Sequence, residues 1–138
     1  MTRLRFHTLI VLILFSSITV ESLAVSFQPF EAEAFADLRQ NGALVLIDIG
    51  APWCSTCAKQ KKILQSYAAD RTDVELAVLS VDFDTQKDWV RRFRARRQST
   101  LILFSGDKPL WFSVAETRKS IIYENLDKGF SGLSETTL

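Results

Sequence analysis

The stretch Trp53-Cys54-Ser55-Thr56-Cys57 decides the fold that the sequence predicts, and it holds both cysteines of the chain. It follows an apolar run at 43–49 and opens a segment with helical spacing. Residues i and i+3 of a helix share one face, so the two sulfurs can meet in a first helical turn. We therefore expect a strand, a short turn and a helix that starts with a cysteine pair.

A helix start favours a reactive sulfur. Its backbone N–H groups are unpaired and the helix dipole is positive there, so a thiol pKa falls below its free value of about 8.5. Cys54 is the predicted nucleophile, and Cys57, expected to be the more buried, is the predicted resolving thiol of a redox-active disulfide. The alternative is a structural disulfide, although a cross-link over so short a loop stabilises a fold little.

The segment from Asp48 to Cys57 (Asp-Ile-Gly-Ala-Pro-Trp-Cys-Ser-Thr-Cys) resembles the active-site segment of the thioredoxin family. The similarity continues through 81–84 and 100–104 and covers roughly residues 27–126. The resemblance implies an α/β thioredoxin fold, in which a central mixed β-sheet is flanked by helices on both faces. It also implies a thiol–disulfide oxidoreductase that acts on client proteins with disulfides and needs no cofactor.

The pattern along the chain predicts the same architecture in one domain at 25–128. A short extended lead-in at 27–30 precedes helices at 31–40, 54–69, 88–94 and 117–126, and strands at 43–49, 74–82, 100–104 and 109–114. We expect 129–138 to form a loose tail. The inner face of the second helix is expected to carry Ala58, Ile63, Leu64 and Tyr67.

Asp48 stands in the apolar run, six residues before Cys54. Burial there raises a carboxyl pKa. In the family, the matching aspartate moves protons to or from the inner thiol, so the resemblance implies that Asp48 is a general acid/base. The alternative is a strand-end carboxylate that is hydrogen-bonded to backbone.

The resemblance also implies a substrate groove around the cysteine pair. Trp53 is expected to shield the pair, and Ser55 and Thr56 are expected to tune its redox potential through backbone N–H and hydroxyl hydrogen bonds to Cys54. The remaining groove residues lie on two other segments of the chain: Gln98, Ser99, Thr100 and Ala115.

Two groove positions depart from the family pattern. Ser99 stands where the family has a cis-proline, and a cis bond before a non-proline residue costs about 3–4 kcal/mol. We therefore predict a trans Gln98–Ser99 peptide and altered docking of the substrate strand. Ala115 stands where the family usually has a glycine, and its methyl group is expected to narrow the groove.

Five arginines crowd the segment before Ser99. They fit a solvated helix face with cations near a helix C-terminus. The alternative is a docking patch for an acidic partner beside the active site. The five are Arg91, Arg92, Arg94, Arg96 and Arg97.

Residues 1–24 have the pattern of a secretory signal peptide. Arg3 and Arg5 begin it, an apolar run at 9–20 follows, and small residues precede a cleavage site after Ala24. The run is short for a bilayer span, although an uncleaved membrane anchor is the alternative. We expect a periplasmic protein that a membrane thiol electron donor keeps reduced, by analogy with the family.

Removal of 1–24 would lower Lys plus Arg from 17 to 15 and Asp plus Glu from 16 to 15, and would remove the single histidine, His7. The remaining domain would be formally neutral and would contain no histidine. The lack of histidine excludes Ser-His and Cys-His catalysis and His-containing zinc sites. We expect a monomer that binds no nucleic acid.

Two other functions remain open. One is a metal-handling or docking module with little turnover, where two thiolates would suit only a soft ion such as Cu(I). No metal site is predicted within the chain. The other is an oxidase, because the Ser55-Thr56 dipeptide does not reveal the direction of electron flow.

Overall fold

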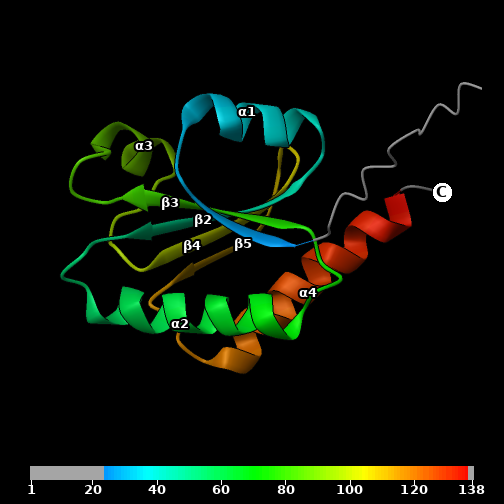
Figure 1. Cartoon of the computed structure of the whole chain (residues 1–138). Coiled ribbons are helices and arrows are strands. Elements are labelled where there is room, and N and C mark those ends of the chain that lie inside the picture. The colour runs from blue at the N-terminus through cyan, green and yellow to red at the C-terminus, as the bar shows by residue number, and fades with distance from the viewer. Residues whose placement is uncertain (1–23, 137–138) are drawn as a thin grey trace, which may run out of the picture.

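The computed structural model describes residues 24–136 (Figure 1). The predicted signal peptide, except for Ala24, lies outside this range. The predicted order of elements is confirmed: β1 (Val25–Pro29), α1 (Ala32–Gln40), β2 (Leu44–Gly50), α2 (Ser55–Asp70), β3 (Leu76–Asp82), α3 (Lys87–Arg92), β4 (Thr100–Ser105), β5 (Lys108–Val114) and α4 (Lys119–Thr136).

The five strands form one sheet in the order β1-β3-β2-β4-β5. β3 runs parallel to β1 and β2, because helical crossovers join these strands. β4 runs antiparallel to β2 and β5, and a short turn joins β4 to β5. The sheet is therefore mixed, as predicted. Pro109 lies on the edge strand β5, where a residue without an N–H is tolerated.

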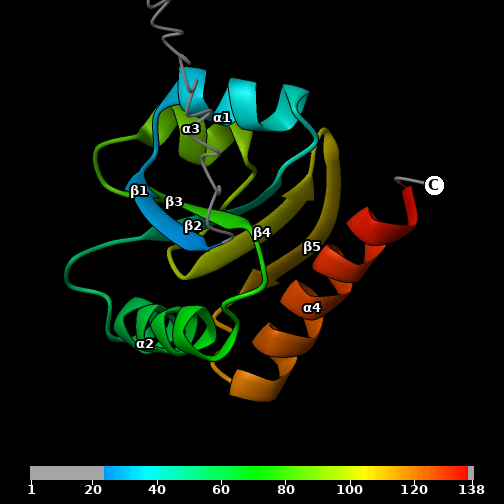
Figure 2. The same cartoon turned by 45° about the vertical axis from the view of Figure 1, so that its right-hand side comes forward.

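Alternation along β2 separates two cores. Val45, Ile47 and Ile49 pack on the face of the sheet that α1 and α3 cover. Leu44 and Leu46 pack on the opposite face with α2 and α4. Figures 1 and 2 show one pair of helices on each side of the sheet. Side chains of a strand alternate between faces, so the next even position, residue 48, faces α2.

The predicted loose tail at 129–138 is wrong over most of its length, because α4 continues to Thr136. Gly129 is buried, and a Cβ built on it would lie 2.7 Å from Leu103 Cδ2 and 3.1 Å from Leu44 Cδ1. Polar residues between the apolar ones hid the helical periodicity. The apolar stripe that packs on the sheet consists of Ile122, Leu126, Phe130 and Leu133.

A polar clamp joins α4 to the end of α2. The Tyr67 hydroxyl donates to Asp127 Oδ1 over 2.9 Å. Arg71 donates from Nε to the same oxygen and from Nη2 to Asp127 Oδ2, at 3.2 and 3.0 Å.

Within residues 24–136, no helix has both the length and the apolar character needed to cross a membrane.

The two glycines of α4 provide a test of its packing. Gly129→Ala should lower the free energy of unfolding by about 1 kcal/mol, because overpacking against Leu103 exceeds the gain in helix propensity. Gly132→Ala should raise it by about 0.5–1 kcal/mol, because a Cβ there meets no atom within 4 Å. Urea denaturation measures both. Equal effects of the two substitutions would contradict the docking of 129–136 on the sheet.

Candidate active site

The cysteine pair lies where β2 ends and α2 begins. Cys54 is the N-cap of α2, and its Sγ accepts a hydrogen bond from the Cys57 backbone N–H over 3.0 Å. The two residues form a disulfide with their Cα atoms 5.3 Å apart. The predicted strand, turn and helix start are confirmed. An N–H aimed at Cys54 Sγ stabilises negative charge on this sulfur, as the predicted nucleophile needs.

The relative burial of the two cysteines differs from the prediction. Cys54 is only 6% exposed, whereas Cys57 is half-buried. Cys57 packs against Gly50, where a Cβ would lie 3.6 Å from Cys57 Sγ. The missing side chain at Gly50 leaves the Cys57 sulfur open to an adjoining cleft. The Ser99 side chain lies against Cys54 Sγ, which helps to bury it.

The Ser99 hydroxyl contacts both sulfurs. Its Oγ lies 3.0 Å from Cys54 Sγ and 3.2 Å from Cys57 Sγ. A disulfide sulfur carries no proton, so the Ser99 O–H is the donor in these contacts. The expected hydroxyl contacts from Ser55 and Thr56 are not found among residues 24–136, so the prediction that these two hydroxyls bond to Cys54 is wrong.

The Ser99 backbone explains how the hydroxyl reaches the sulfurs. The Gln98–Ser99 peptide is trans, which confirms the prediction, and Ser99 has a left-handed φ of 61°. Proline could not adopt this φ, because its ring fixes φ near −65°. Ala115 is also left-handed, with φ 58°, and its N–H donates to Ser99 O over 2.8 Å. Ser99 and Ala115, which were both predicted as groove residues, are therefore in direct contact.

Gln60 is a site residue that the sequence reasoning missed. Its side chain is fully buried, and its Nε2 donates to Ser99 O over 3.2 Å and to Glu116 O over 3.0 Å. The predicted inner position Ala58 is instead exposed. A buried amide in a helix leaves no periodic signal, because its two partners lie 39 and 56 residues away in the chain. Gln60 thus ties the Ser99 loop and the end of β5 to α2.

Asp48 lies beneath the pair, in a cleft of about 590 Å³ that Cys54, Cys57 and Lys61 also line. Burial raises the pKa of Asp48 to about 6, and the charge of Lys61 acts in the opposite direction. Among residues 24–136, Asp48 Oδ1 is buried and has no hydrogen-bond partner. Asp48 is half-buried as a residue and its Oδ1 is buried, and the direction of the pKa shift agrees with the prediction. The role as general acid/base stays a prediction that this shared cleft supports.

The other groove residues differ in exposure. Trp53 is 64% exposed, and its indole N–H donates to Asp84 Oδ2 over 2.7 Å. Thr100 is fully buried and donates from Oγ1 to Arg97 O, so it cannot line a groove as predicted. Gln98 is half-buried next to Ser99. The accessible rim of the pair is therefore formed by Trp53, Gln98 and Ala115.

The five arginines divide into two groups. Arg91 forms an ion pair with Asp88, and the guanidinium of Arg92 lies over the Trp89 ring. The other three have exposed side chains with no partner within the described part of the chain, and they precede Ser99 directly: Arg94, Arg96 and Arg97.

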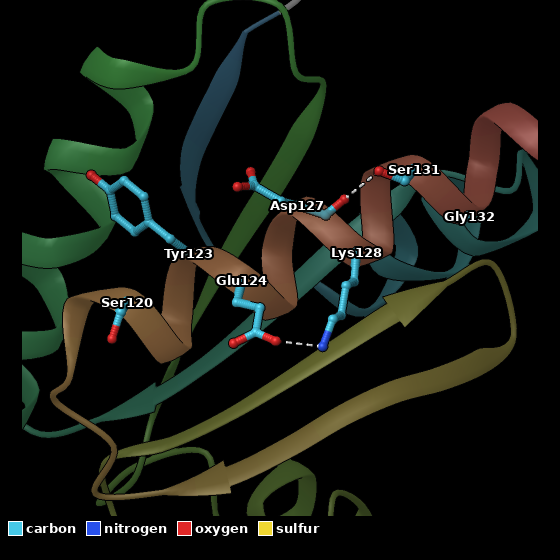
Figure 3. A pocket seen from close by; sticks show the side chains of 7 residues that line it. All are labelled: Ser120, Tyr123, Glu124, Asp127, Lys128, Ser131 and Gly132. Carbon is cyan, nitrogen blue, oxygen red and sulfur yellow. Dashed lines mark hydrogen bonds and ion pairs between the residues drawn. The ribbon is translucent and has the colours of Figure 1, made fainter.

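A second hollow lies on the outer side of α4, where every lining residue comes from that helix (Figure 3). Its charged side chains, Glu124, Asp127 and Lys128, already have partners. Lys128 contacts Glu124 at 2.6 Å, and the Ser131 hydroxyl donates to Asp127 O at 3.0 Å. The hollow contains no cysteine, so the candidate redox site is the cysteine pair at the start of α2.

Within residues 24–136, no group of three or more His, Cys, Asp or Glu could hold a metal ion.

The raised pKa of Asp48 makes the stability of the protein depend on pH. The folded-state pKa of about 6 exceeds the ordinary aspartate value of 3.8, so the folded protein holds more protons between these values and its stability falls as pH rises. Asp48→Asn should therefore raise the free energy of unfolding by an amount on the order of 3 kcal/mol above pH 7, and by little below pH ~4. Urea denaturation across this range measures it. An effect independent of pH would contradict the buried, ionised carboxylate.

Comparisons with known proteins agree with this geometry. The family model Thioredoxin matches residues 26–128. Thioredoxin from Chlamydia trachomatis serovar D is 33% identical over 101 residues, which cover 73% of this chain and 96% of that protein. The bifunctional thioredoxin reductase/thioredoxin of Mycobacterium leprae is 28% identical over 106 residues, 77% of this chain, and the chain spans only 23% of its length.

A solved structure gives the same result. The structure of Trxlp from Edwardsiella tarda EIB202 has a TM-score of 0.69 and 37% sequence identity, and covers 73% of this chain and 98% of that one. The family match covers most of the described chain, and the disulfide lies at the start of α2. The chain therefore belongs to the thioredoxin family and is a thiol–disulfide oxidoreductase.

Proposed function

We propose that the protein is an exported reductase that reduces disulfides of client proteins through the Cys54–Cys57 pair. The observation that carries this proposal is the hydrogen bond from the Cys57 N–H to Cys54 Sγ at the start of α2. This contact favours the Cys54 thiolate in the reduced protein, and the thiolate is the attacking species in disulfide exchange.

The proposed reaction has two exchange steps. The Cys54 thiolate attacks one sulfur of a client disulfide, so a Cys54–client bond forms and the first client thiolate leaves. The Cys57 thiolate then attacks Cys54 Sγ, so the Cys54–Cys57 disulfide forms and the second client thiolate leaves. The client disulfide gains two electrons, the cysteine pair loses two, and both client thiolates take protons at the pH of the solution.

Asp48 is the proposed proton acceptor for the second step. Its carboxyl group shares a cleft with Cys57, and burial raises its pKa to about 6. A base with this pKa is ionised at pH 7 and is close enough to neutrality to exchange protons efficiently. Because Asp48 Oδ1 has no hydrogen-bond partner in the described range, it is free to accept the Cys57 proton directly or through water.

Export and electron supply complete the proposal. The basic start, apolar run and small residues at 1–24 support a signal peptide and a periplasmic location. A pair that reduces clients there must be reduced again after each turnover, and a membrane thiol protein is the proposed donor. We propose that the protein acts as a monomer, since one chain supplies both cysteines and Asp48.

Trapping of the mixed disulfide tests the proposed order of attack. Cys57→Ser should accumulate a covalent complex between Cys54 and a client protein that carries a disulfide, because the resolving thiol is missing. Non-reducing electrophoresis and mass spectrometry of the reduced variant mixed with client detect this complex. Cys54→Ser is the matched control and should accumulate none. A complex that forms through Cys57 in the control would contradict Cys54 as the nucleophile.

The unpaired arginines before Ser99 favour clients with acidic surfaces near the disulfide. Arg97 lies two residues from Ser99, so its Cα is within about 7 Å of the Ser99 Cα. Reversal of charge with Arg96→Glu and Arg97→Glu should lower kcat/KM for an acidic client by about tenfold at low salt, and less at high salt.

The control for this reversal changes the same number of charges elsewhere. Lys62→Glu with Lys108→Glu alters one exposed side chain on α2 and one at the start of β5. Lys108 pairs with Ser105, at the opposite end of β4 from Ser99. This double variant should leave kcat/KM near the unsubstituted value. Equal rates for the two double variants would show that the arginines form only a solvated face.

A further inference from the structure

The Ser99 side chain is a polar group at the reacting sulfurs that the mechanism above does not use. Its Oγ lies 3.0 Å from Cys54 Sγ and 3.2 Å from Cys57 Sγ, and Ser99 is only 3% exposed. A proline at this position would offer no donor. This chain therefore places a buried hydroxyl where the family pattern has none.

The surroundings hold this hydroxyl in place. Ser99 O accepts two hydrogen bonds, one from the Ala115 N–H at 2.8 Å and one from Gln60 Nε2 at 3.2 Å. The next residue is fixed as well, because Thr100 Oγ1 donates to Arg97 O at 2.7 Å. With its carbonyl turned inward and φ at 61°, Ser99 directs its Cβ and Oγ toward the cysteine pair.

We propose that the Ser99 hydroxyl is a catalytic residue that donates a hydrogen bond to whichever cysteine sulfur carries negative charge during disulfide exchange. In the reduced protein the acceptor is the Cys54 thiolate, which then has two donors, the Cys57 N–H and the Ser99 O–H. A hydrogen bond to an ionised group is stronger than one between neutral groups, so it lowers the pKa of the Cys54 thiol.

The two distances also fit the second exchange step. When the Cys57 thiolate attacks Cys54 Sγ, charge moves from Cys57 through Cys54 to the departing client sulfur. Ser99 Oγ reaches both cysteine sulfurs from one position, so its O–H can follow the charge without movement of the loop. The hydroxyl stays protonated throughout, and the exchange consumes no group other than the thiolates named above.

The pKa of the Cys54 thiol in the full-length reduced protein tests this proposal. Ser99→Ala should raise this pKa by about one unit, equivalent to tenfold less thiolate at a pH below it. The measurement is the rate of Cys54 alkylation by iodoacetamide against pH, with the modified residue identified by mass spectrometry. The midpoint of the profile reports the pKa, and the plateau separately reports access to the sulfur.

A second readout is the equilibrium with glutathione. Loss of the donor destabilises the thiolate form, so Ser99→Ala should shift the pair toward the disulfide by up to about tenfold, or about 30 mV for a two-electron couple. Ser55→Ala is the control for the pKa, because Ser55 is next to Cys54 in the sequence and its hydroxyl contacts neither sulfur in the described range. Its midpoint should match that of the unsubstituted protein.

A third variant separates the hydroxyl from the backbone. Ser99→Gly also lacks the donor but adopts a positive φ without strain, so it should raise the pKa as much as Ser99→Ala does. The proposal would be overturned if Ser99→Ala kept the Cys54 pKa of the unsubstituted protein. It would also be overturned if Ser99→Ala raised this pKa and Ser99→Gly did not. The first result would show that the hydroxyl does not act on the thiolate, and the second that only the backbone conformation matters.

Discussion

The hydrogen bond from the Cys57 N–H to Cys54 Sγ is the contact on which the active site depends. It makes a sulfur the N-cap of α2, a position that usually holds a hydroxyl or a carboxylate oxygen. The cap exists because β2 ends at Gly50 and the chain turns there into the helix. The same strand places Asp48 two residues earlier on the face toward α2, so strand geometry brings both sulfurs and a buried carboxyl into one cleft.

The replacement of proline by Ser99 changes the edge that faces these sulfurs. The left-handed backbone conformation costs free energy in any residue that has a Cβ. Ser99 and Ala115 both adopt it, and they are in contact. Three hydrogen bonds from Gln60 and Ala115 hold the arrangement. The Ser99 carbonyl points inward to these donors, so a client strand cannot use it. Whether client strands dock differently here stays a prediction, and a hydroxyl at the sulfurs accompanies the change of residue.

The sequence predicted features that follow from local pattern. The continuous apolar run of β2 indicated a buried central strand, and the position of Asp48 within it indicated a buried carboxyl with a raised pKa. The spacing of Cys54 and Cys57 placed them in one helical turn. These inferences needed only the residues of one strand and one helix.

Other features depend on contacts between distant segments, which no local pattern contains. The amide of Gln60 is buried because two carbonyl groups from other elements meet it. The left-handed Ser99 depends on the Ala115 N–H, 16 positions later in the sequence. Ser99 contacts both sulfurs, but the missing side chain at Gly50 lies beside Cys57, which leaves Cys57 less buried than Cys54. The end of α4 was not predicted because packing against the sheet, rather than a strong local pattern, holds it as a helix.

The reduction potential of the Cys54–Cys57 pair in a glutathione buffer tests the proposed function most directly. The account predicts one two-electron transition near thioredoxin's value of about −270 mV, raised by the hydrogen bonds that stabilise the Cys54 thiolate. A value near about −120 mV would mean that the pair oxidises its clients, and would contradict the proposed reductase. The absence of a two-electron transition would contradict redox turnover altogether.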